Sequence, residues 1–309
     1  MENTFNVQGL FNALGTINYV RISSDHDQSI LRSIEQRIRK LDDYLSLFKK
    51  DSEVSRINKL SGLSAVHVGS DTFTVIEKAV DMAKCTKGAY DISINPVMEL
   101  WRIAKKTGIL PDRYSIQKTL DLVNYKDISL DKDISTVFLK RKGQSIDLGG
   151  IAKGYAVDIA REMLKKAGIN NAIINFGGTV CALGTSFDVG IQHPLMQTNC
   201  SFGSITLADE CIATSGIYQN NFKLHGLEYH HIIDKSTGYP VKNSLLSVSV
   251  IGQEAAMLDA VATAALVNWP DEYRRITKKH NLSYVYITKD LDVLASKKVD
   301  ISDGKDRIA

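Results

Sequence analysis

One segment, in which a predicted strand runs through two glycines into a predicted helix, constrains the fold of this chain most strongly. It reads Asp147-Leu-Gly-Gly-Ile-Ala-Lys-Gly-Tyr155. The apolar residues that then recur every four positions are Ile151, Tyr155, Ile159 and Met163. This spacing predicts an amphipathic helix over Ile151–Lys166, with Gly168 placed to end it. An apolar strand, Ala172–Phe176, is expected next.

The two glycines and the helix start together form a candidate anion site. Glycine lets a ligand approach the backbone, and the free N–H groups at a helix start favour anions such as phosphate. Lys153, in the first turn, would add a charge-assisted contact. The pattern is neither a P-loop nor a dinucleotide-binding fingerprint, and a tight strand–helix turn without a ligand explains it equally well. A second glycine turn, Asn175-Phe-Gly-Gly178, is equally ambiguous.

The other predicted elements mix hairpins with scattered helices. The predicted strands are Leu14–Ile22, Phe202–Ala208, Leu245–Ile251 and Ser283–Thr288. The predicted helices are Ser29–Leu45, Asp71–Lys84 and Glu254–Leu266. A hairpin is expected over Ser135–Leu148, with Arg141-Lys142-Gly143 at its turn. Because strands and helices do not alternate strictly, the pattern indicates an α+β fold and not a series of βαβ units.

Composition and charge exclude several classes of protein. Of the 309 residues, 44% are apolar and 24% are charged, which is typical of one large globular domain or two moderate ones. The net charge of +3, without a dense Lys/Arg run, argues against a nucleic-acid binder. Because no signal-peptide pattern and no lipobox is recognisable, we expect a cytoplasmic protein, or an extracytoplasmic one only if a leader has been removed.

The four cysteines do not suggest a metal site. They are Cys85, Cys181, Cys200 and Cys211, and none shows Cys-x-x-Cys spacing. Neither a zinc site nor a redox dithiol is therefore expected. We expect small core residues or free thiols.

Asp259 and Thr263 stand out within an otherwise apolar predicted helix. Residues four apart share one helical face, so a carboxylate and a hydroxyl project together from a buried segment. A buried carboxylate needs a cation, a basic side chain or backbone donors. Hard oxygen ligands suit Mg²⁺ or Ca²⁺, with phosphates or waters completing the shell. Alternatively, Asp259 bonds a neighbouring loop and Thr263 bonds back to its own helix.

Two further polar motifs are compatible with chemistry. In the segment from His230-His231 to Asp234, a histidine three residues before an aspartate can act as a general base that the carboxylate orients. The same aspartate, followed by Lys-Ser-Thr-Gly, more often forms an Asx turn. Thr214-Ser215-Gly216 would contact a phosphate or ribose, or would cap a turn.

Together and in this order, the motifs resemble the FAD:protein FMN transferase (ApbE) family. The matching segments are Leu14-Gly-Thr16, Ser52-Glu-Val-Ser-Arg-Ile-Asn58, Gly88-Ala-Tyr-Asp91, Asp147-Leu-Gly-Gly-Ile-Ala-Lys-Gly154, Thr214-Ser-Gly216, His231-Ile-Ile-Asp-x-x-Thr-Gly238 and Asp259-Ala-Val-Ala-Thr263. They extend over nearly the whole chain. The resemblance implies a T-fold-related α+β fold of mixed sheets with flanking helices and a cleft between subdomains. It also implies one flavin transferase domain over residues 1–309, or two interleaved α/β subdomains.

The resemblance further implies an activity. Family members bind FAD and Mg²⁺, transfer the FMN half of FAD to a Ser or Thr hydroxyl of a target protein, and release AMP. The expected partner is a flavoprotein whose FMN-binding domain carries the acceptor, with no nucleic acid and no membrane segment. Two alternatives stay open: a Mg²⁺-dependent FAD pyrophosphatase that yields FMN and AMP, and a non-catalytic protein that binds or delivers FAD.

Position by position, the resemblance assigns roles to individual residues. The implied metal ligands are Asp259, Thr263 and the backbone oxygens of Gly150 and Ala262. His231 would help to deprotonate the incoming hydroxyl. The implied FAD contacts are Leu14, Phe48, Ala89, Tyr90, Asp91, Asp147, Lys153, Thr214, Ser215, Gly216 and Ile233. The positions that depart from the family, which often has Met, Tyr, Phe and Pro there, are Leu14, Phe48, Tyr90 and Lys235; the last is expected to loosen its turn.

Overall fold

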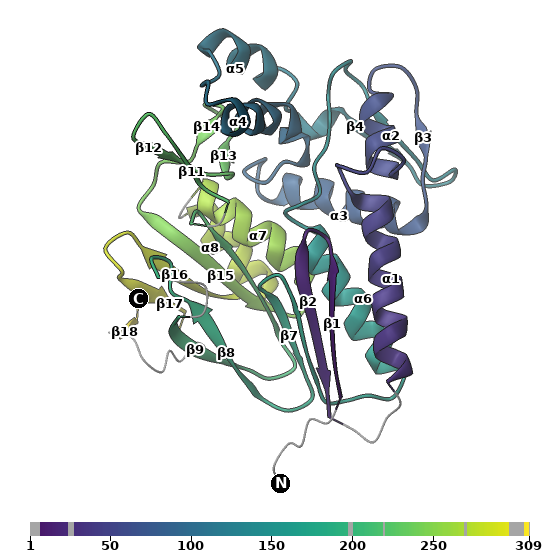
Figure 1. The fold of residues 1–309 in the computed structure, drawn as a ribbon, viewed down its shortest axis with the longest axis vertical. Helices are drawn as coiled ribbons and strands as arrows, with labels where there is room; N and C mark the ends of the chain where they lie inside the picture. Colours follow the sequence, from purple (N-terminus) through teal and green to yellow (C-terminus); the bar gives the residue numbers. More distant parts are fainter. Residues whose placement is uncertain are drawn as a thin grey trace.

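A nine-stranded mixed sheet organises the described part of the chain (Figure 1). The computed structural model describes residues 7–23, 28–196, 200–218, 220–268, 271–296 and 306–308. From edge to edge, the strands are β1 (Val7–Ala13), β2 (Thr16–Ile22), β6 (Ala172–Phe176), β7 (Thr179–Leu183), β10 (Cys211–Gly216), β15 (Leu245–Gly252), β16 (Ser283–Thr288), β17 (Val293–Ala295) and β18 (Asp306–Ile308). Neighbouring strands are antiparallel except for the last pair.

Smaller sheets and the helices surround this sheet. The small sheets are β3 (Val66–His67) with β5 (Thr136–Leu139) and β4 (Ile128–Asp131), β8 (Phe187–Gln192) with β9 (Ser201–Leu207), β11 (Phe222–Leu224) with β12 (Leu227–Tyr229), and β13 (Ile233–Asp234) with β14 (Tyr239–Pro240). The α-helices are α1 (Ser29–Leu45), α2 (Glu53–Lys59), α3 (Ser70–Cys85), α4 (Asn95–Thr107), α5 (Arg113–Leu120), α6 (Ala152–Lys166), α7 (Ala255–Val267) and α8 (Asp271–His280), and the 3₁₀ helices are η1 (Ile92–Ile94) and η2 (Tyr125–Asp127).

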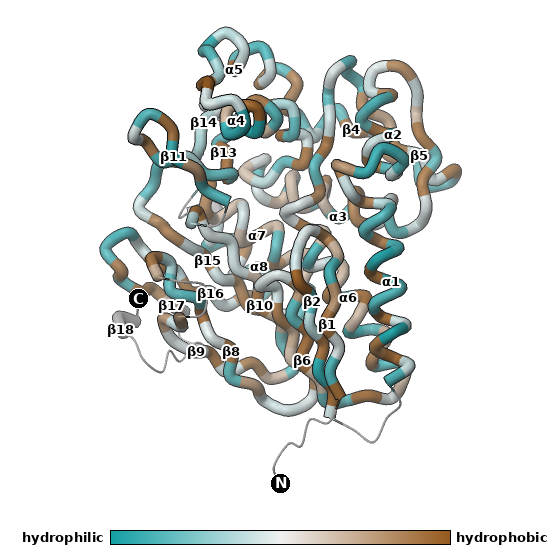
Figure 2. Tube along the Cα trace, in the orientation of Figure 1, coloured by the Kyte–Doolittle hydropathy of each residue, from teal (hydrophilic) through white to brown (hydrophobic). Residues whose placement is uncertain are grey.

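Both faces of the sheet centre are covered. Helices α1, α6 and α7 pack on one face, and the β8–β9 hairpin contributes Ile191, Ile205 and Leu207 to a second apolar cluster. Every residue of β7 and β15 is therefore buried, which is typical of strands covered on both faces. Figure 2 shows α1 alternating between hydrophilic and hydrophobic residues, as a helix with one solvent face does. Within the described ranges, no helix has the length and hydrophobicity needed to cross a bilayer.

The α+β class and most of the predicted elements are confirmed. The helix at Ser29–Leu45 and the strands at Ala172–Phe176 and Ser283–Thr288 have the predicted bounds. The predicted α3, α6, β9, β15 and α7 lie within one residue of the observed bounds. These segments have either a clear apolar periodicity or a continuous apolar run, the two strongest signals of secondary structure.

The predicted strand over Leu14–Ile22 is wrong at its start. Leu14 and Gly15 form a two-residue turn between β1 and β2, and Ala13 pairs with Thr16 across it. Both turn residues have positive φ angles, 56° for Leu14 and 71° for Gly15, as a tight hairpin requires. Because leucine rarely adopts this conformation, nothing at Leu14 indicates a turn. Its apolar side chain instead continues the alternating pattern of the strand, so the prediction began the strand there.

The predicted hairpin over Ser135–Leu148 is also wrong. β5 pairs with β4, which precedes it, and the turn between them lies at residues 132–135. The Asp131 carboxylate accepts hydrogen bonds from the backbone N–H groups of Asp133 (3.1 Å) and Ile134 (3.3 Å), which favours a turn here. The rest of the predicted hairpin forms no strand.

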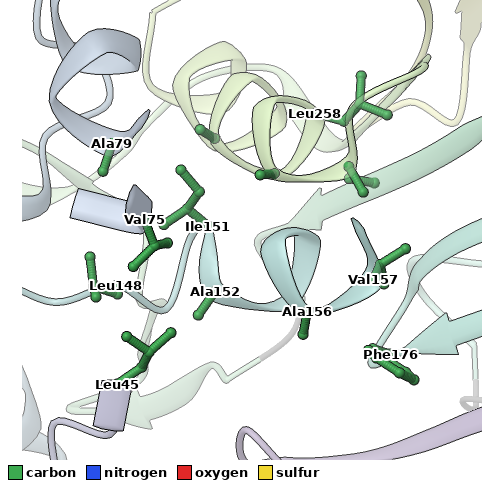
Figure 3. Close-up of a cluster of buried hydrophobic side chains, with 14 of the residues drawn as sticks. Leu45, Val75, Ala79, Leu148, Ile151, Ala152, Ala156, Val157, Phe176 and Leu258 are labelled. Atoms are coloured by element: carbon green, nitrogen blue, oxygen red, sulfur yellow. The ribbon is translucent and has the colours of Figure 1, made fainter. Parts of the chain in front are cut away.

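Helix α6 packs closely on α7 and buries a different face from the one predicted. Its buried residues are Ala152, Gly154, Ala156, Val157, Ala160 and Leu164. The larger side chains of Tyr155, Ile159 and Met163 are only partly buried. A Cβ atom at Gly154 would clash with the backbone carbonyl of Ala255 at the start of α7. This contact therefore requires a residue without a side chain. Figure 3 shows Ala152 and Ala156, two other small residues of α6, within the buried cluster.

Replacing Gly154 by Ala is expected to destabilise the protein by about 1–3 kcal/mol. Alanine normally favours a helix interior over glycine by ~1 kcal/mol, but here its methyl group must push α6 and α7 apart. The urea midpoint would measure the loss. The control is Lys165→Ala on the exposed face of α6, which should change stability by less than about 0.5 kcal/mol. A Gly154→Ala midpoint at or above that of the wild type would contradict the prediction.

Asp158 connects the same two helices. Its carboxylate oxygens accept hydrogen bonds from the backbone N–H groups of Ala255 and Ala256, at 2.9 Å each. Burial raises the pKa of Asp158, and the two backbone donors oppose that rise. The carboxylate satisfies two of the free donors at the start of α7 and complements the positive end of the helix dipole. Asp158 therefore fixes the start of α7 relative to α6.

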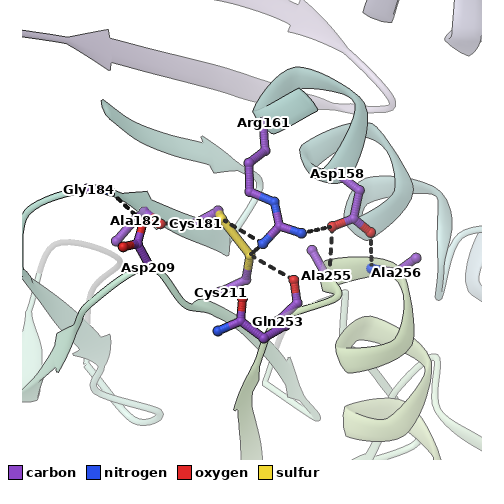
Figure 4. The surroundings of a disulfide bond; sticks show 10 residues. All are labelled: Asp158, Arg161, Cys181, Ala182, Gly184, Asp209, Cys211, Gln253, Ala255 and Ala256. Atoms are coloured by element: carbon purple, nitrogen blue, oxygen red, sulfur yellow. Dashed lines mark hydrogen bonds and ion pairs between the residues drawn. A yellow bond between two sulfur atoms is a disulfide. The ribbon is translucent and has the colours of Figure 1, made fainter. Parts of the chain in front are cut away.

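The prediction that the cysteines are core residues or free thiols is confirmed, but it missed a disulfide between the two buried ones. Cys85 and Cys200 are free, but Cys181 of β7 and Cys211 of β10 form a disulfide (Figure 4). The two residues lie opposite each other on antiparallel strands, a proximity that sequence spacing does not reveal. The Arg161 guanidinium lies 3.5 Å from the Cys211 sulfur.

Candidate functional site

A cavity of about 730 Å³ brings together polar side chains from segments far apart in the chain. The site residues predicted from the sequence all line it, except Ala262. They come from the β1–β2 turn, the loop after α1, the segment before η1, the glycine turn before α6, the first turn of α6, the end of β10, the segment around β13, and α7. Ala262 is buried in α7 next to Thr263. The cavity is within the size range of cofactor and small-molecule sites.

The buried carboxylate of Asp259 defines one corner of the cavity. Its side chain is 3% exposed, and its Oδ2 atom accepts hydrogen bonds from Lys153 Nζ (3.3 Å) and from the backbone N–H of Gly154 (3.2 Å). Thr263 donates its hydroxyl to the Asp259 carbonyl oxygen at 3.1 Å. The predicted bond from Thr263 back to its own helix is confirmed, but Asp259 bonds the first turn of helix α6 and not a loop. The carboxylate and the hydroxyl nevertheless both line the cavity.

The oxygen atoms of this corner fit a hard divalent cation. The backbone of Gly150 lies opposite Thr263, where a Cβ atom would come within 3.4 Å of the hydroxyl oxygen and fill the corner. Among the described residues, no group of three His, Cys, Asp or Glu side chains could hold a metal. A cation would therefore need the Asp259 carboxylate together with a hydroxyl, backbone oxygens and ligand phosphates, a donor set suited to Mg²⁺.

Tyr90 adds a buried hydroxyl to the same corner. This hydroxyl has no hydrogen-bond partner within the part of the chain that the structure describes. Burial, and secondarily the Asp259 carboxylate, raises the pKa of Tyr90 well above its usual range. Because the hydroxyl stays protonated, it can donate a hydrogen bond to an anionic ligand in the cavity.

Asp147 holds the glycine turn in place. Its Oδ1 atom accepts a hydrogen bond from the Gly149 N–H at 2.8 Å, and its Oδ2 atom accepts one from Arg102 Nη2 at 2.7 Å. The ring centre of Phe48 lies 5.7 Å from the Arg102 guanidinium, and Phe48 is 80% exposed. The guanidinium and the exposed ring together form one wall of the cavity.

Arg102 is a cavity residue that the sequence analysis missed, because helix α4 was not predicted. The signals were nevertheless present in the sequence. Pro96 lies in the first turn, and Gly108 ends the helix in the left-handed conformation. The buried apolar residues of α4, which recur at helical spacing, are Val97, Trp101 and Ala104.

The turn between β13 and β14 carries Lys235 into the cavity. The Asp234 carboxylate accepts hydrogen bonds from the Ser236 N–H (2.8 Å) and hydroxyl (2.7 Å), so the Asx turn is confirmed. The Lys235 ammonium lies 3.3 Å from Asp91 Oδ2 and 5.6 Å from the centre of the Tyr125 ring. The replacement of proline by Lys235 was expected to loosen this turn. The ion pair with Asp91 instead connects the turn to the segment before η1.

The end of β10 supplies hydroxyl groups to another wall. Thr214 Oγ1 lies 2.8 Å from Ser249 Oγ, on the neighbouring strand β15. Ser215 Oγ lies 3.1 Å from Thr263 Oγ1 and so connects this wall to the carboxylate corner. No side chain extends from Gly216, where a Cβ atom would contact the Tyr218 ring.

His231 lines the cavity next to a histidine that fixes the local backbone. His230 is buried; its Nε2–H donates to the carbonyl oxygen of Val241 (3.0 Å), and its Nδ1 accepts from the Ile232 N–H (3.3 Å). This assignment follows from the two partners. Burial lowers the pKa of His230, so the neutral ring is the stable form in the folded protein.

Lowering the pH through about 6.5 is expected to destabilise the fold partly through His230. The folded-state pKa lies below the unfolded value, so the contribution is fully present above about pH 6.5 and is lost as the pH falls towards the folded-state pKa. Titration of one histidine can change the free energy of unfolding by at most about 1.4 kcal/mol per pH unit. Urea unfolding at several pH values should show a smaller slope for His230→Asn. Burial also lowers the pKa of His280. His280 should therefore preserve part of the pH dependence of the unfolding free energy in the His230→Asn protein.

The control for this experiment is His225→Asn in the exposed β11–β12 turn. It should leave the pH slope of the unfolding free energy unchanged. A His230→Asn protein with the wild-type slope would show that protonation of His230 does not limit stability.

Comparisons with known proteins agree on one family. The ApbE family model matches residues 14–286. A protein named FAD:protein FMN transferase from Klebsiella pneumoniae (strain 342) is 30% identical over 272 residues, which cover 88% of this chain and 86% of that protein. A protein of the same name from Vibrio cholerae is 28% identical and covers 88% of this chain and 84% of that protein.

Solved structures also match this fold. The crystal structure of the ApbE protein from Thermotoga maritima superposes with a TM-score of 0.85 at 29% identity, covering 94% of this chain and 97% of that one. The flavin transferase ApbE from Vibrio cholerae superposes with a TM-score of 0.83 at 24% identity, covering 94% and 98%. At 24% identity, the superposition on the Vibrio cholerae protein shows that the two proteins share a fold.

Proposed function

Because this chain belongs to the ApbE family, we propose that it is an FAD:protein FMN transferase that moves the FMN half of FAD to a Ser or Thr hydroxyl of a target flavoprotein. The observation that carries the proposal is the cavity, which gathers the residues predicted to bind FAD around a buried carboxylate corner. Since these residues come from segments between Leu14 and Thr263, we also propose that the chain works as one domain.

We propose that Mg²⁺ is held by the Asp259 carboxylate, the Thr263 hydroxyl and the backbone oxygens of Gly150 and Ala262. The buried carboxylate and the space opposite Thr263 that a side chain would fill support this choice. When bound, the ion would neutralise charge on the FAD pyrophosphate and on the departing AMP.

The side chains of the cavity would mainly orient FAD and neutralise its charge. The Lys153 ammonium would bind phosphate oxygens. The Gly149 N–H is not available for this, because it donates to the Asp147 carboxylate. Protonated Tyr90 supplies a further donor. Phosphoryl-type transfer requires little more from a protein than positioning and charge neutralisation.

His231 would accept the proton of the acceptor hydroxyl. The hydroxyl oxygen then bonds to the phosphorus of the FMN half, and the bond from that phosphorus to the bridging pyrophosphate oxygen breaks. AMP leaves with the bridging oxygen, and the target carries FMN through a phosphoester. No oxidant or reductant is needed, because the flavin ring does not react.

The partner that we propose is a flavoprotein with an FMN-binding domain that carries the acceptor Ser or Thr. The test incubates the full chain with FAD and Mg²⁺, with and without the FMN-binding domain of a soluble reductase. AMP and free FMN are quantified, and a gel is read for covalent flavin fluorescence. Fluorescent acceptor that disappears with EDTA is the expected result. AMP with only free FMN would indicate a pyrophosphatase, and bound FAD without AMP would indicate a carrier.

A further inference from the structure

We propose that the Lys153 ammonium competes with the divalent cation for Asp259, so that metal and FAD bind cooperatively. Lys153 Nζ lies 3.3 Å from Asp259 Oδ2 and 3.1 Å from the carbonyl oxygen of Gly149. Gly149 and Asp259 neighbour two of the other proposed metal ligands, since Gly150 follows Gly149 and the Thr263 hydroxyl donates to the Asp259 carbonyl oxygen. The ammonium therefore lies in the corner proposed for the cation. The inference rests on the metal site of the proposed function.

The charges at this corner favour such competition. Asp259 is the one carboxylate among the proposed metal ligands, and no group of three acidic or metal-binding side chains occurs in the described ranges. With Lys153 paired to Asp259, the two charges cancel and attract a divalent cation weakly. The ammonium, with its side chain 25% exposed, is on a flexible stem and can move to another anion.

FAD supplies that anion. Its pyrophosphate gives Lys153 a new partner and gives the cation the phosphate oxygens that Mg²⁺ sites commonly use. Each ligand then removes an obstacle to the other. By linkage, the factor by which FAD tightens metal binding equals the factor by which the metal tightens FAD binding.

A matched ion pair in the same cavity provides the control. Lys235 lies at the same distance from Asp91, 3.3 Å, and its side chain is 31% exposed. Removing its charge changes the cavity to a similar extent but leaves the Asp259 corner intact. A general effect of net charge would therefore be the same for both lysines, and competition at Asp259 would be specific to Lys153.

The test measures Mn²⁺ binding to the full chain by electron paramagnetic resonance, without nucleotide, with Mg²⁺ as a competitor. Lys153→Gln should bind Mn²⁺ about tenfold more tightly than the wild type. Lys235→Gln should match the wild type, and Lys153→Arg, which keeps the charge, should not bind more tightly. If Lys153→Gln fails to fold, Lys153→Met provides the same comparison.

Equal Mn²⁺ affinity of Lys153→Gln and the wild type would overturn the proposal, as would an equal gain in Lys235→Gln. The titration uses neither FAD nor an acceptor protein, so either result leaves the transferase assay unaffected. Conversely, a chain that shows the expected Mn²⁺ affinities but produces no AMP from FAD would contradict the proposed function and not this inference.

Discussion

Replacing Asp259 by Asn is expected to lower the Mg²⁺-dependent release of AMP from FAD by about 1000-fold or more. The reason is that metal ions contribute several kcal/mol of charge stabilisation to such transfers, and each 1.36 kcal/mol is a factor of ten in rate. Asparagine keeps the size of the side chain and an acceptor for the Gly154 N–H, so the loss isolates the charge. Initial rates at limiting Mg²⁺ would measure the effect.

Asp158→Asn is the matched control for this prediction. Asp158 is another largely buried carboxylate bonded to α7, but it does not line the cavity. Its replacement should lower stability and leave the AMP rate within a few-fold of the wild type. If Asp259→Asn retained the wild-type rate at limiting Mg²⁺, the metal assignment would be wrong.

Replacing His231 by Ala is expected to slow the transfer of FMN to the acceptor by about 10²–10⁴-fold, the usual contribution of a general base. FAD and metal binding should stay close to wild type, because the phosphate and metal contacts lie on other elements. Covalent flavin fluorescence over time would measure the rate, and flavin fluorescence quenching would measure FAD binding.

Imidazole distinguishes loss of a base from loss of structure. Added imidazole should restore part of the rate of His231→Ala, since it can enter the cavity and accept the proton. The control is His67→Ala on β3, which is exposed and does not line the cavity. A rate for His231→Ala within threefold of the wild type would remove the residue from the mechanism.

Sequence patterns predicted most elements with strong periodicity, although helix α4 was missed despite its helical spacing. They failed where turn chemistry or small residues decided the outcome. The β1–β2 turn was missed because Leu14 adopts a left-handed conformation that leucine seldom takes. The face of α6 was misassigned because hydrophobicity favours large side chains, and the contact with α7 at Gly154 requires small ones. Neither feature has a signal in apolar periodicity.

The site residues were found from motifs, and their connections were not predictable. Arg102 reaches Asp147, 45 positions away, and Lys235 reaches Asp91, 144 positions away. Such pairs depend on how distant elements pack, which local patterns do not encode.

The order of strands in the large sheet has a consequence for synthesis on the ribosome. Strand β2 pairs with β6, so Val20 of β2 cannot pair until Ile174 of β6 has been synthesised. Translation of the intervening chain takes on the order of ten seconds. Helix α7, with Asp259, emerges later still. A nascent chain therefore exposes the unpaired edge of β2 during about half of its synthesis, which favours aggregation or chaperone binding. We expect that no C-terminally shortened product lacking α7 can bind FAD and the metal together.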